Sequence, residues 1–297
     1  MSGAPDPPDG GYPEHLRTLV ERYLESLDFA AQGLRAELAE AMRYSLLAGG
    51  KRIRPVLTLA VAESCGRPPE SMLPTAAAFE LIHTYSLIHD DLPAIDDDDL
   101  RRGRPTCHVV YGEDVAILAG DGLFAEAFSL VLDRQEAAAS TLVHVLGEIA
   151  RATGLGGMVG GQYMDIVSTR AVDVDLRTMH ELKTGRLIEA AVVCGALLCG
   201  AREAAVEEYR AFAAELGLLF QIVDDILDVV GDSESLGKTA GKDAQAAKLT
   251  YVSRHGLAGA RDLARQAHRR SRELLDRLPG DGSSLAAVAD YILDRES

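Results

Sequence analysis

Two runs of aspartate are the residues of this chain whose types and spacing could do chemistry. One extends from Asp90 to Asp99 and holds six aspartates within ten positions, and the other holds Asp224, Asp225 and Asp228. Carboxylates at this density repel one another unless cations neutralise them. Oxygen ligands without Cys or His at ligand spacing suit Mg²⁺, which shares its shell with phosphate oxygens. The two runs predict a magnesium site and a phosphorylated substrate.

The second run lies in an apolar stretch, which distinguishes it from a solvated helix face. Asp224 and Asp228 are four residues apart, so one helical turn brings both carboxylates within reach of one cation. Their neighbours between Leu218 and Leu227 are mostly apolar, and a carboxylate in such surroundings needs a partner. We expect this run to face a metal ion.

The first run cannot be a straight helix if its ends act together. Asp90 and Asp96 are six residues apart and would lie on different faces of a helix, but Pro93 removes a backbone donor and distorts it. Helix geometry alone leaves open whether Asp96, Asp97 or Asp98 joins Asp90.

Positive charge is sparse and lies beside loops. The chain has 30 Lys and Arg against 46 Asp and Glu, a net charge of −16. The basic segments are Gly49–Pro55, Arg101–Pro105 and the single residues Lys183, Arg186, Lys238 and Lys242. Such side chains are candidates for holding a diphosphate. His83 lies two turns before Asp90 on the same helix face, which favours a ligand-facing role over a core role.

The elements that must position these residues are helices. Apolar residues recur at spacings of three and four from about Pro13 to Leu293, interrupted by Gly and Pro, which predicts an all-α fold. We expect a flexible tail at residues 1–13 and one helical domain at residues 14–297. The net negative charge excludes a general nucleic-acid binder.

The apolar run Ala190–Ala201 is shorter than the roughly 18 residues of a membrane span, so we expect a buried helix and no membrane insertion. The four cysteines form no CxxC pair and are read as packing residues. With no signal-peptide pattern, these features favour a cytoplasmic protein.

Taken in order, the motifs resemble those of the short-chain trans-prenyltransferases, or polyprenyl synthases, and most closely the bacterial-type farnesyl diphosphate synthases. The resemblance is nearly full length. The matching motifs are Gly49–Pro55, His83–Asp91, both aspartate runs, Arg101–His108, Gly161–Asp165, Lys183–Gly185, Gly237–Lys238 and Lys248–Tyr251.

The resemblance implies an isoprenoid-synthase bundle of about ten or more helices around a central cavity, usually a homodimer, with about three magnesium ions in each site. The implied metal ligands are Asp90, Asp96 and Asp224, supported by Asp91, Asp225 and Asp228. The implied residues for isopentenyl diphosphate are Gly50, Lys51, Arg54, His83 and Arg102. Those for the allylic diphosphate are Arg101, Lys183, Thr184, Gln221 and Lys238.

The implied reaction joins isopentenyl diphosphate to dimethylallyl or geranyl diphosphate. The departing pyrophosphate is stabilised, the allylic bond ionises, the double bond attacks the carbocation and a proton is lost. We expect the segment from Gly237 to Lys242 to close over the leaving group and exclude water.

Tyr85, beside Ser86, lies about 7.5 Å deeper along the helix than Asp90 and would form the floor of the cavity. In the resembling family this favours farnesyl diphosphate over the alternative, geranylgeranyl diphosphate. A terpene cyclase is a more remote alternative, because it needs no second basic site.

Overall fold

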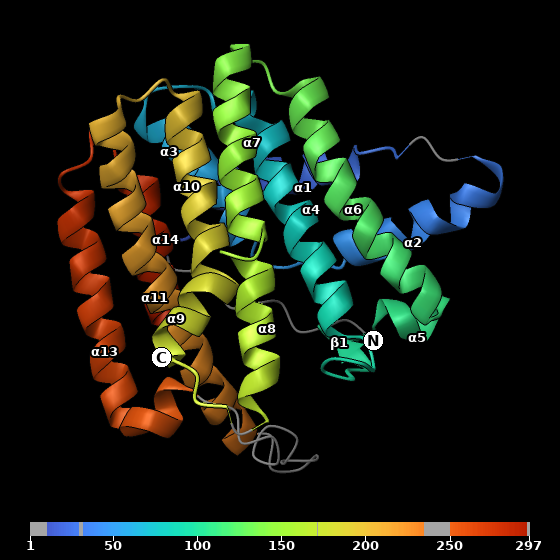
Figure 1. The fold of residues 1–297 in the computed structure, drawn as a ribbon. Coiled ribbons are helices and arrows are strands. Elements are labelled where there is room, and N and C mark those ends of the chain that lie inside the picture. The colour runs from blue at the N-terminus through green and yellow to red at the C-terminus, as the bar shows by residue number, and fades with distance from the viewer. Residues whose placement is uncertain (1–10, 30–31, 171, 235–249, 296–297) are drawn as a thin grey trace.

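The computed structural model describes residues 11–29, 32–170, 172–234 and 250–295 (Figure 1). The α-helices are α1 (Glu14–Glu25), α2 (Ala36–Leu46), α3 (Ile53–Ser64), α4 (Leu73–Asp90), α5 (Cys107–Tyr111), α6 (Glu113–Arg134), α7 (Ala139–Thr153), α8 (Met158–Ser168), α9 (Leu176–His180), α10 (Arg186–Leu198), α11 (Glu203–Glu234), α13 (Tyr251–Leu275) and α14 (Ser283–Asp294). Short 3₁₀ turns form at η1 (Gly33–Arg35) and η2 (Pro69–Met72), and a π-helical turn forms at η3 (Glu181–Gly185).

The prediction of an all-α fold is confirmed. Among the described residues the sheet content is one antiparallel pair, β1 (Leu100–Arg101) with β2 (Arg104–Pro105). The boundary predicted between a tail and a domain stays a prediction, because residues 1–10 lie outside the described part. Tyr12 within that predicted tail is buried, and its hydroxyl donates to the carbonyl oxygen of Lys51 at 2.6 Å.

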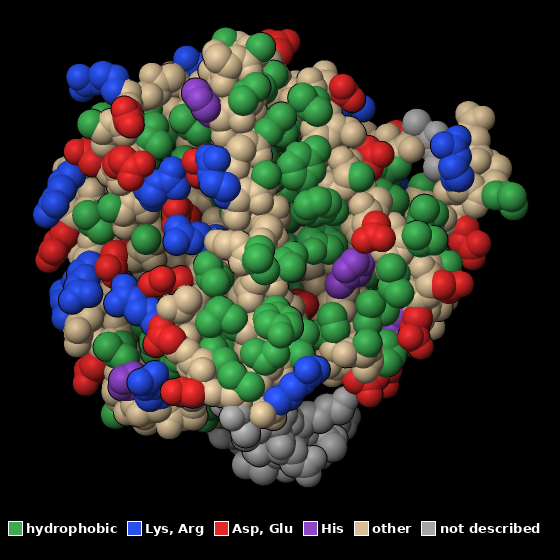
Figure 2. Space-filling view, in the orientation of Figure 1, with side chains coloured by type: hydrophobic (Ala, Val, Ile, Leu, Met, Phe, Trp, Pro, Cys, Tyr) green, Lys and Arg blue, Asp and Glu red, His purple; other side chains and the backbone are tan. Residues whose placement is uncertain are grey.

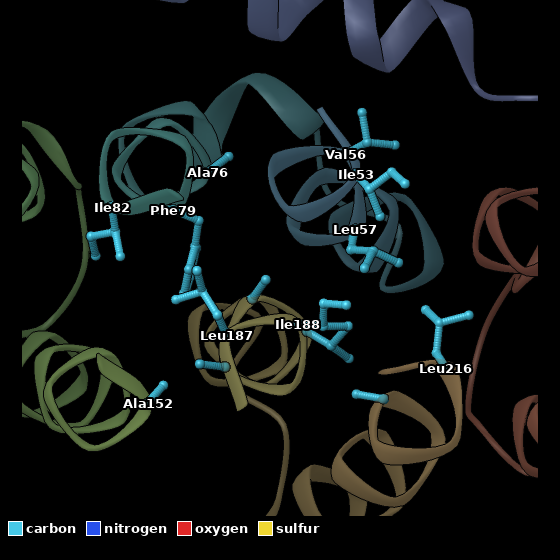
Figure 3. Packing of buried hydrophobic residues seen from close by; sticks show 14 of the residues in the cluster. Ile53, Val56, Leu57, Ala76, Phe79, Ile82, Ala152, Leu187, Ile188 and Leu216 are labelled. Atoms are coloured by element: carbon cyan, nitrogen blue, oxygen red, sulfur yellow. The ribbon is translucent and has the colours of Figure 1, made fainter. Parts of the chain in front are cut away.

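Helix α10 lies at the centre of the bundle, as the apolar run predicted. Figure 3 shows Leu187 and Ile188 of α10 surrounded by residues of α3, α4, α7 and α11. Side chains that are fully buried in this way contribute about 2 kcal/mol each relative to exposure. Helix α3 approaches α10 closely at Gly195, where a Cβ atom would lie 2.9 Å from the Cβ of Val61. This core holds the helices whose ends carry the polar residues of the site.

An apolar face remains exposed over α5 to α8. Figure 2 shows hydrophobic side chains gathered on this side of the molecule. The exposed large residues on these helices and the loop between α7 and α8 are Val109, Val110, Ile117, Leu118, Leu132, Val143, Leu155, Val159 and Tyr163.

By length and composition α6 could cross a membrane, although Asp121 and Glu126 interrupt it. One such helix is weak evidence for a membrane span, because core helices of globular proteins pass the same test.

Candidate active site

A cavity of about 530 Å³ opens between α4, α8, η3 and α11. It brings together many of the residues predicted from sequence, namely Arg54, His83, Tyr85, Ser86, Asp90, Arg101, Arg102, Lys183, Thr184 and Asp224. Residues more than a hundred positions apart in sequence therefore line the same cavity. A second cavity lies beside it and is lined by Gly50, Lys51 and Arg295, with Arg54, His83 and Arg102 belonging to both.

The loop after α4 turns back on the helix end and brings Asp96 next to Asp90. The backbone N–H of Asp96 donates to the carbonyl oxygen of Asp90 at 2.9 Å. Asp97 takes a left-handed conformation with φ 53° and is exposed. Burial and then the nearby charge of Asp96 raise the pKa of Asp90 to about 6, against the opposing effect of Lys183. Asp90 lines the cavity, whereas Asp96 is not among the lining residues and adds its negative charge from beside Asp90.

Asp91 has a different partner from its neighbour Asp90. Arg101 donates to both carboxylate oxygens of Asp91 at 2.5 to 2.9 Å, and Asp91 is buried. Burial raises the pKa of Asp91, while the Arg101 hydrogen bonds lower it. Arg101 also lines the cavity, so Asp91 holds in place a guanidinium that can meet an anion. The predicted support of Asp91 to a metal stays a prediction.

The second aspartate run divides in the same way. Asp224 lines the cavity, whereas Asp225 accepts hydrogen bonds from the Gln221 side chain at 2.9 Å and from the Tyr251 backbone N–H at 2.7 Å. Burial raises the pKa of Asp225 to about 6. Asp228 is exposed on α11. Gln221 lines a smaller neighbouring cavity of about 160 Å³ rather than the main one.

Lys183 and Thr184 lie in the π-helical turn η3, which interrupts the path from α9 to α10. Single π turns leave backbone groups outside the regular ladder and are frequent at functional sites. Gly161 of α8 permits this turn to approach, because a Cβ atom there would lie 2.1 Å from the backbone nitrogen of Lys183. The Lys183 ammonium pairs with Asp165 on α8.

Arg54, His83 and Arg102 lie where the two cavities meet. A Cβ atom at Gly50 would lie 2.6 Å from the Arg102 guanidinium, which donates to the carbonyl oxygen of Gly49. Burial and the charge of Arg54 hold the pKa of His83 well below its ordinary value, so the imidazole is neutral. The buried Nε of Arg54 has no hydrogen-bond partner among the described residues. A buried N–H donor without a partner on a guanidinium that lines both cavities favours an anion there.

Arg52 is the middle cation of the Gly49–Pro55 segment. It lies at the second cavity, but its charge is already paired with carboxylates. Its buried guanidinium pairs with Glu80 at 2.5 Å and Glu21 at 2.9 Å and donates to the Leu46 carbonyl oxygen. Its φ of 52° is left-handed. Arg52 therefore joins three helices and fixes the loop that carries Lys51.

Sequence reasoning missed Arg295 and one face of α8. The Arg295 guanidinium lies 4.0 Å from Asp224 and 5.6 Å from the centre of the Phe220 ring. The cavity-lining residues of α8 are Met158, Val159, Gln162, Tyr163 and Ile166. Their spacing marks one helical face and could have revealed them, whereas Arg295 had no signal in sequence.

Lys238 and the expected closing segment from Gly237 to Lys242 lie outside the described residues, so both stay predictions. Within the described part of the chain, no group of three Asp, Glu, His or Cys side chains is close enough to hold a metal ion unaided. A bound metal would need ligands from elsewhere, such as substrate oxygens.

Residues 35–290 match the polyprenyl synthetase family profile. The chain is 49% identical over 263 residues to the chloroplastic geranylgeranyl pyrophosphate synthase of Capsicum annuum, covering 87% of this chain and 71% of that protein.

The chain belongs to the polyprenyl synthetase family. It is a prenyltransferase, as the motifs predicted. A dimethylallyltranstransferase of Fischerella ambigua is 44% identical, with 95% of this chain and 83% of that protein covered.

Solved structures agree with this family and with the isoprenoid-synthase fold. A putative farnesyl-diphosphate synthase from a Marinomonas species is 38% identical with a TM-score of 0.78, covering 95% of this chain and 97% of that chain. An FPP/GFPP synthase from Zymomonas mobilis is 32% identical with a TM-score of 0.82, covering 94% and 96%.

Proposed function

We propose that this prenyltransferase condenses isopentenyl diphosphate with allylic diphosphates, namely dimethylallyl and geranyl diphosphate. The observation that carries this proposal is that two cavities meet at Arg54, His83 and Arg102. The main cavity carries Asp90 and Asp224 beside Lys and Arg side chains, which suits a diphosphate that arrives with divalent metal. The second cavity suits a second diphosphate bound directly by side chains. A terpene cyclase would have no use for the second site.

The donor set fits Mg²⁺. Asp90, Asp96 and Asp224 offer oxygen ligands, and partial burial raises the pKa values of Asp90 and Asp224, whose charged forms a cation would stabilise. Bound magnesium would supply charge that stabilises the pyrophosphate leaving group. Diphosphate oxygens would complete its coordination shell.

Residues of the chain itself then act on the condensation of the two substrates. Lys183 and Arg101 lie at the cavity where the allylic diphosphate would leave. As its C–O bond breaks and releases pyrophosphate, the double bond of isopentenyl diphosphate attacks the allylic carbon and forms the new C–C bond. The released pyrophosphate then accepts the proton that the condensation product loses. The Thr184 hydroxyl and the π-turn carbonyl groups are dipoles beside the developing carbocation. Met158, Ile166 and Phe220 line the same cavity and exclude water.

Two observations bear on product length, and they favour different products. Relatives named geranylgeranyl pyrophosphate synthase, at 44 to 49% identity, favour the twenty-carbon product. Tyr85 favours the fifteen-carbon product, because its half-buried ring lines the cavity and stacks edge-on against Phe124 with ring centres 5.1 Å apart. The names of the relatives give geranylgeranyl diphosphate the larger weight, and farnesyl diphosphate is the second candidate.

The test is incubation of the enzyme with magnesium, isopentenyl diphosphate and dimethylallyl, geranyl or farnesyl diphosphate. Products are dephosphorylated and identified by mass spectrometry. We expect fifteen- or twenty-carbon alcohols, and their loss when magnesium is chelated. A twenty-carbon alcohol supports geranylgeranyl diphosphate, and a product that ends at fifteen carbons supports farnesyl diphosphate. A cyclised hydrocarbon without elongation, or no reaction with any starter, would refute the proposed condensation.

We also propose that the chain is a cytoplasmic homodimer that pairs through the exposed apolar face of α5 to α8. Its support is the gathering of exposed hydrophobic side chains there (Figure 2), which monomers rarely leave bare. Analytical ultracentrifugation of Leu118→Lys and Val143→Lys should give monomers. Leu34→Lys is the control, because Leu34 is fully exposed on η1. A monomeric native chain would refute the dimer.

A further inference from the structure

Helices α3 and α10 end beside each other, and each ends in a cysteine. Cys65 is the C-cap of α3 and Cys199 is the C-cap of α10. Each is followed by a glycine in the left-handed region, Gly66 with φ 69° and Gly200 with φ 76°. More than 130 positions separate the two cysteines in sequence, so no spacing motif connects them. The sequence analysis read all four cysteines as packing residues.

The two cysteines share the Val61 carbonyl oxygen as a neighbour. It accepts a hydrogen bond from the backbone N–H of Cys65 at 3.0 Å and contacts the Cys199 Sγ at 3.8 Å. The two helices come this near because Gly195 of α10 has no side chain to hold α3 away. Both cysteines therefore contact the Val61 carbonyl oxygen, where α10 packs on α3. Neither is in a disulfide.

The pair differs from the other two cysteines in access and in partners. Cys65 and Cys199 are partly exposed, whereas Cys107 and Cys194 are buried. The Tyr209 hydroxyl lies 3.7 Å from the Cys65 Sγ. The neighbouring Cys199 thiol and the Tyr209 hydroxyl lower the pKa of Cys65 to about 6 against the effect of burial. The same interaction raises the pKa of Cys199.

We propose that Cys65 and Cys199 form a dithiol modification site that a low-molecular-weight disulfide converts reversibly into an intramolecular disulfide. The Cys65 thiolate attacks one sulfur of the disulfide, forms a mixed disulfide and releases one thiolate. Cys199 then loses its proton and attacks the Cys65 sulfur, which releases the second thiol. The two cysteines are oxidised and the small disulfide is reduced to two thiols.

The bond would connect the far ends of the two helices that position the site. Helix α3 begins beside Arg54, and α10 follows the π turn that holds Lys183 and Thr184. Each helix is about 18 to 20 Å long at the usual rise per residue. The disulfide would therefore close a long loop at a distance from the cavity. We expect it to raise the melting temperature by several degrees and to change the turnover rate less than about twofold.

The test uses the full chain and oxidised glutathione. After incubation at pH 7.5 and digestion without reductant, mass spectrometry should find a cross-linked peptide pair that contains Cys65 and Cys199. The free thiols, counted in denaturant, should fall from four to two and return with dithiothreitol. Cys107 and Cys194 are internal controls and should stay reduced. The assay needs no prenyl substrate, so its result is independent of the proposed reaction.

Matched variants assign the two steps. Cys199→Ser should keep glutathione on Cys65, form no cross-link and show no rise in melting temperature. Cys65→Ser should react with glutathione at least tenfold more slowly than Cys199→Ser, because it lacks the more acidic thiol. Separate glutathione on both cysteines without a cross-link would overturn the proposal. So would equal reaction rates of the two variants, or a cross-linked chain that melts no higher than the reduced one.

Discussion

The backbone amide of Asp96 donates a hydrogen bond to the carbonyl oxygen of Asp90, 2.9 Å away, across the loop that ends α4. On a continuous helix these residues would lie about 120° apart around the axis. The loop instead returns the chain to the helix end and brings Asp96 beside Asp90. Two separate helices, α4 through Asp90 and α11 through Asp224, supply the carboxylates that line the cavity.

Asp96→Asn should therefore lower the prenyltransferase rate about a hundredfold, since it removes one charged ligand from the proposed metal site. Steady-state rates over a magnesium titration should also show a higher metal requirement. Asp99→Asn is the matched control, because the Asp99 side chain is 80% exposed. Equal losses in both variants would contradict the assignment of Asp96.

Gly161→Ala should impair activity by displacing η3. The added Cβ atom would lie 2.1 Å from the Lys183 backbone nitrogen, a contact that requires movement of the π turn. We expect at least a tenfold lower rate with retained helical circular dichroism. Gly156→Ala is the control, because nothing lies within 4 Å of a Cβ atom there. A fully active Gly161→Ala enzyme would show that the turn tolerates displacement.

Tyr85→Ala should lengthen the product. Removing the ring opens the cavity toward Phe124, which the Tyr85 ring now covers, and apolar volume becomes available to a longer prenyl chain. Mass spectrometry of dephosphorylated products should show a shift to longer alcohols. Ser86→Ala should change the product little, because the Ser86 hydroxyl bonds to the His83 carbonyl oxygen. An unchanged distribution in Tyr85→Ala would exclude Tyr85 as the floor.

Glu148 should give the bundle a pH-dependent contribution to stability. Burial alone would raise its pKa, but hydrogen bonds from Arg210 and Arg151 lower it below the ordinary value of 4.5. The unfolded chain therefore binds the proton first as pH falls, so the stabilisation is present above about pH 4.5 and is lost at lower pH. Glu148→Gln should lower the free energy of unfolding by about 1 kcal/mol at pH 7.

Chemical denaturation at pH 7 and pH 4 measures this effect. The difference between the native chain and Glu148→Gln should shrink at pH 4, whereas the exposed Glu136→Gln control should show little difference at either pH. A difference that grew as pH fell would mean that the pKa of Glu148 is raised in the folded chain.

Much of the molecule follows from local sequence. Spacings of three and four between apolar residues predict helices, and the all-α fold is confirmed. The order of the motifs predicts the family, and the family is confirmed. Both inferences succeed because helix periodicity and motif order are properties of the sequence itself. The hard cation indicated by Asp224 and Asp228 stays a prediction.

Tertiary structure alone decides which of the neighbouring aspartates face the cavity. Asp90 and Asp224 line it, whereas Asp91 is held by Arg101 and Asp225 by Gln221 and Tyr251. Adjacent residues point about 100° apart on a helix, and only the packing of distant segments determines which direction meets a cavity.

The same reason explains Arg295 and the Cys65–Cys199 pair. Each owes its surroundings to residues far away in sequence. Arg295 lies beside Asp224, and Cys199 contacts the Val61 carbonyl oxygen that also accepts from the Cys65 amide, where α3 packs on α10. Local sequence determines the helices and the kinds of side chain they carry. Which side chains become partners depends on how the buried faces fit together, a property of the whole core.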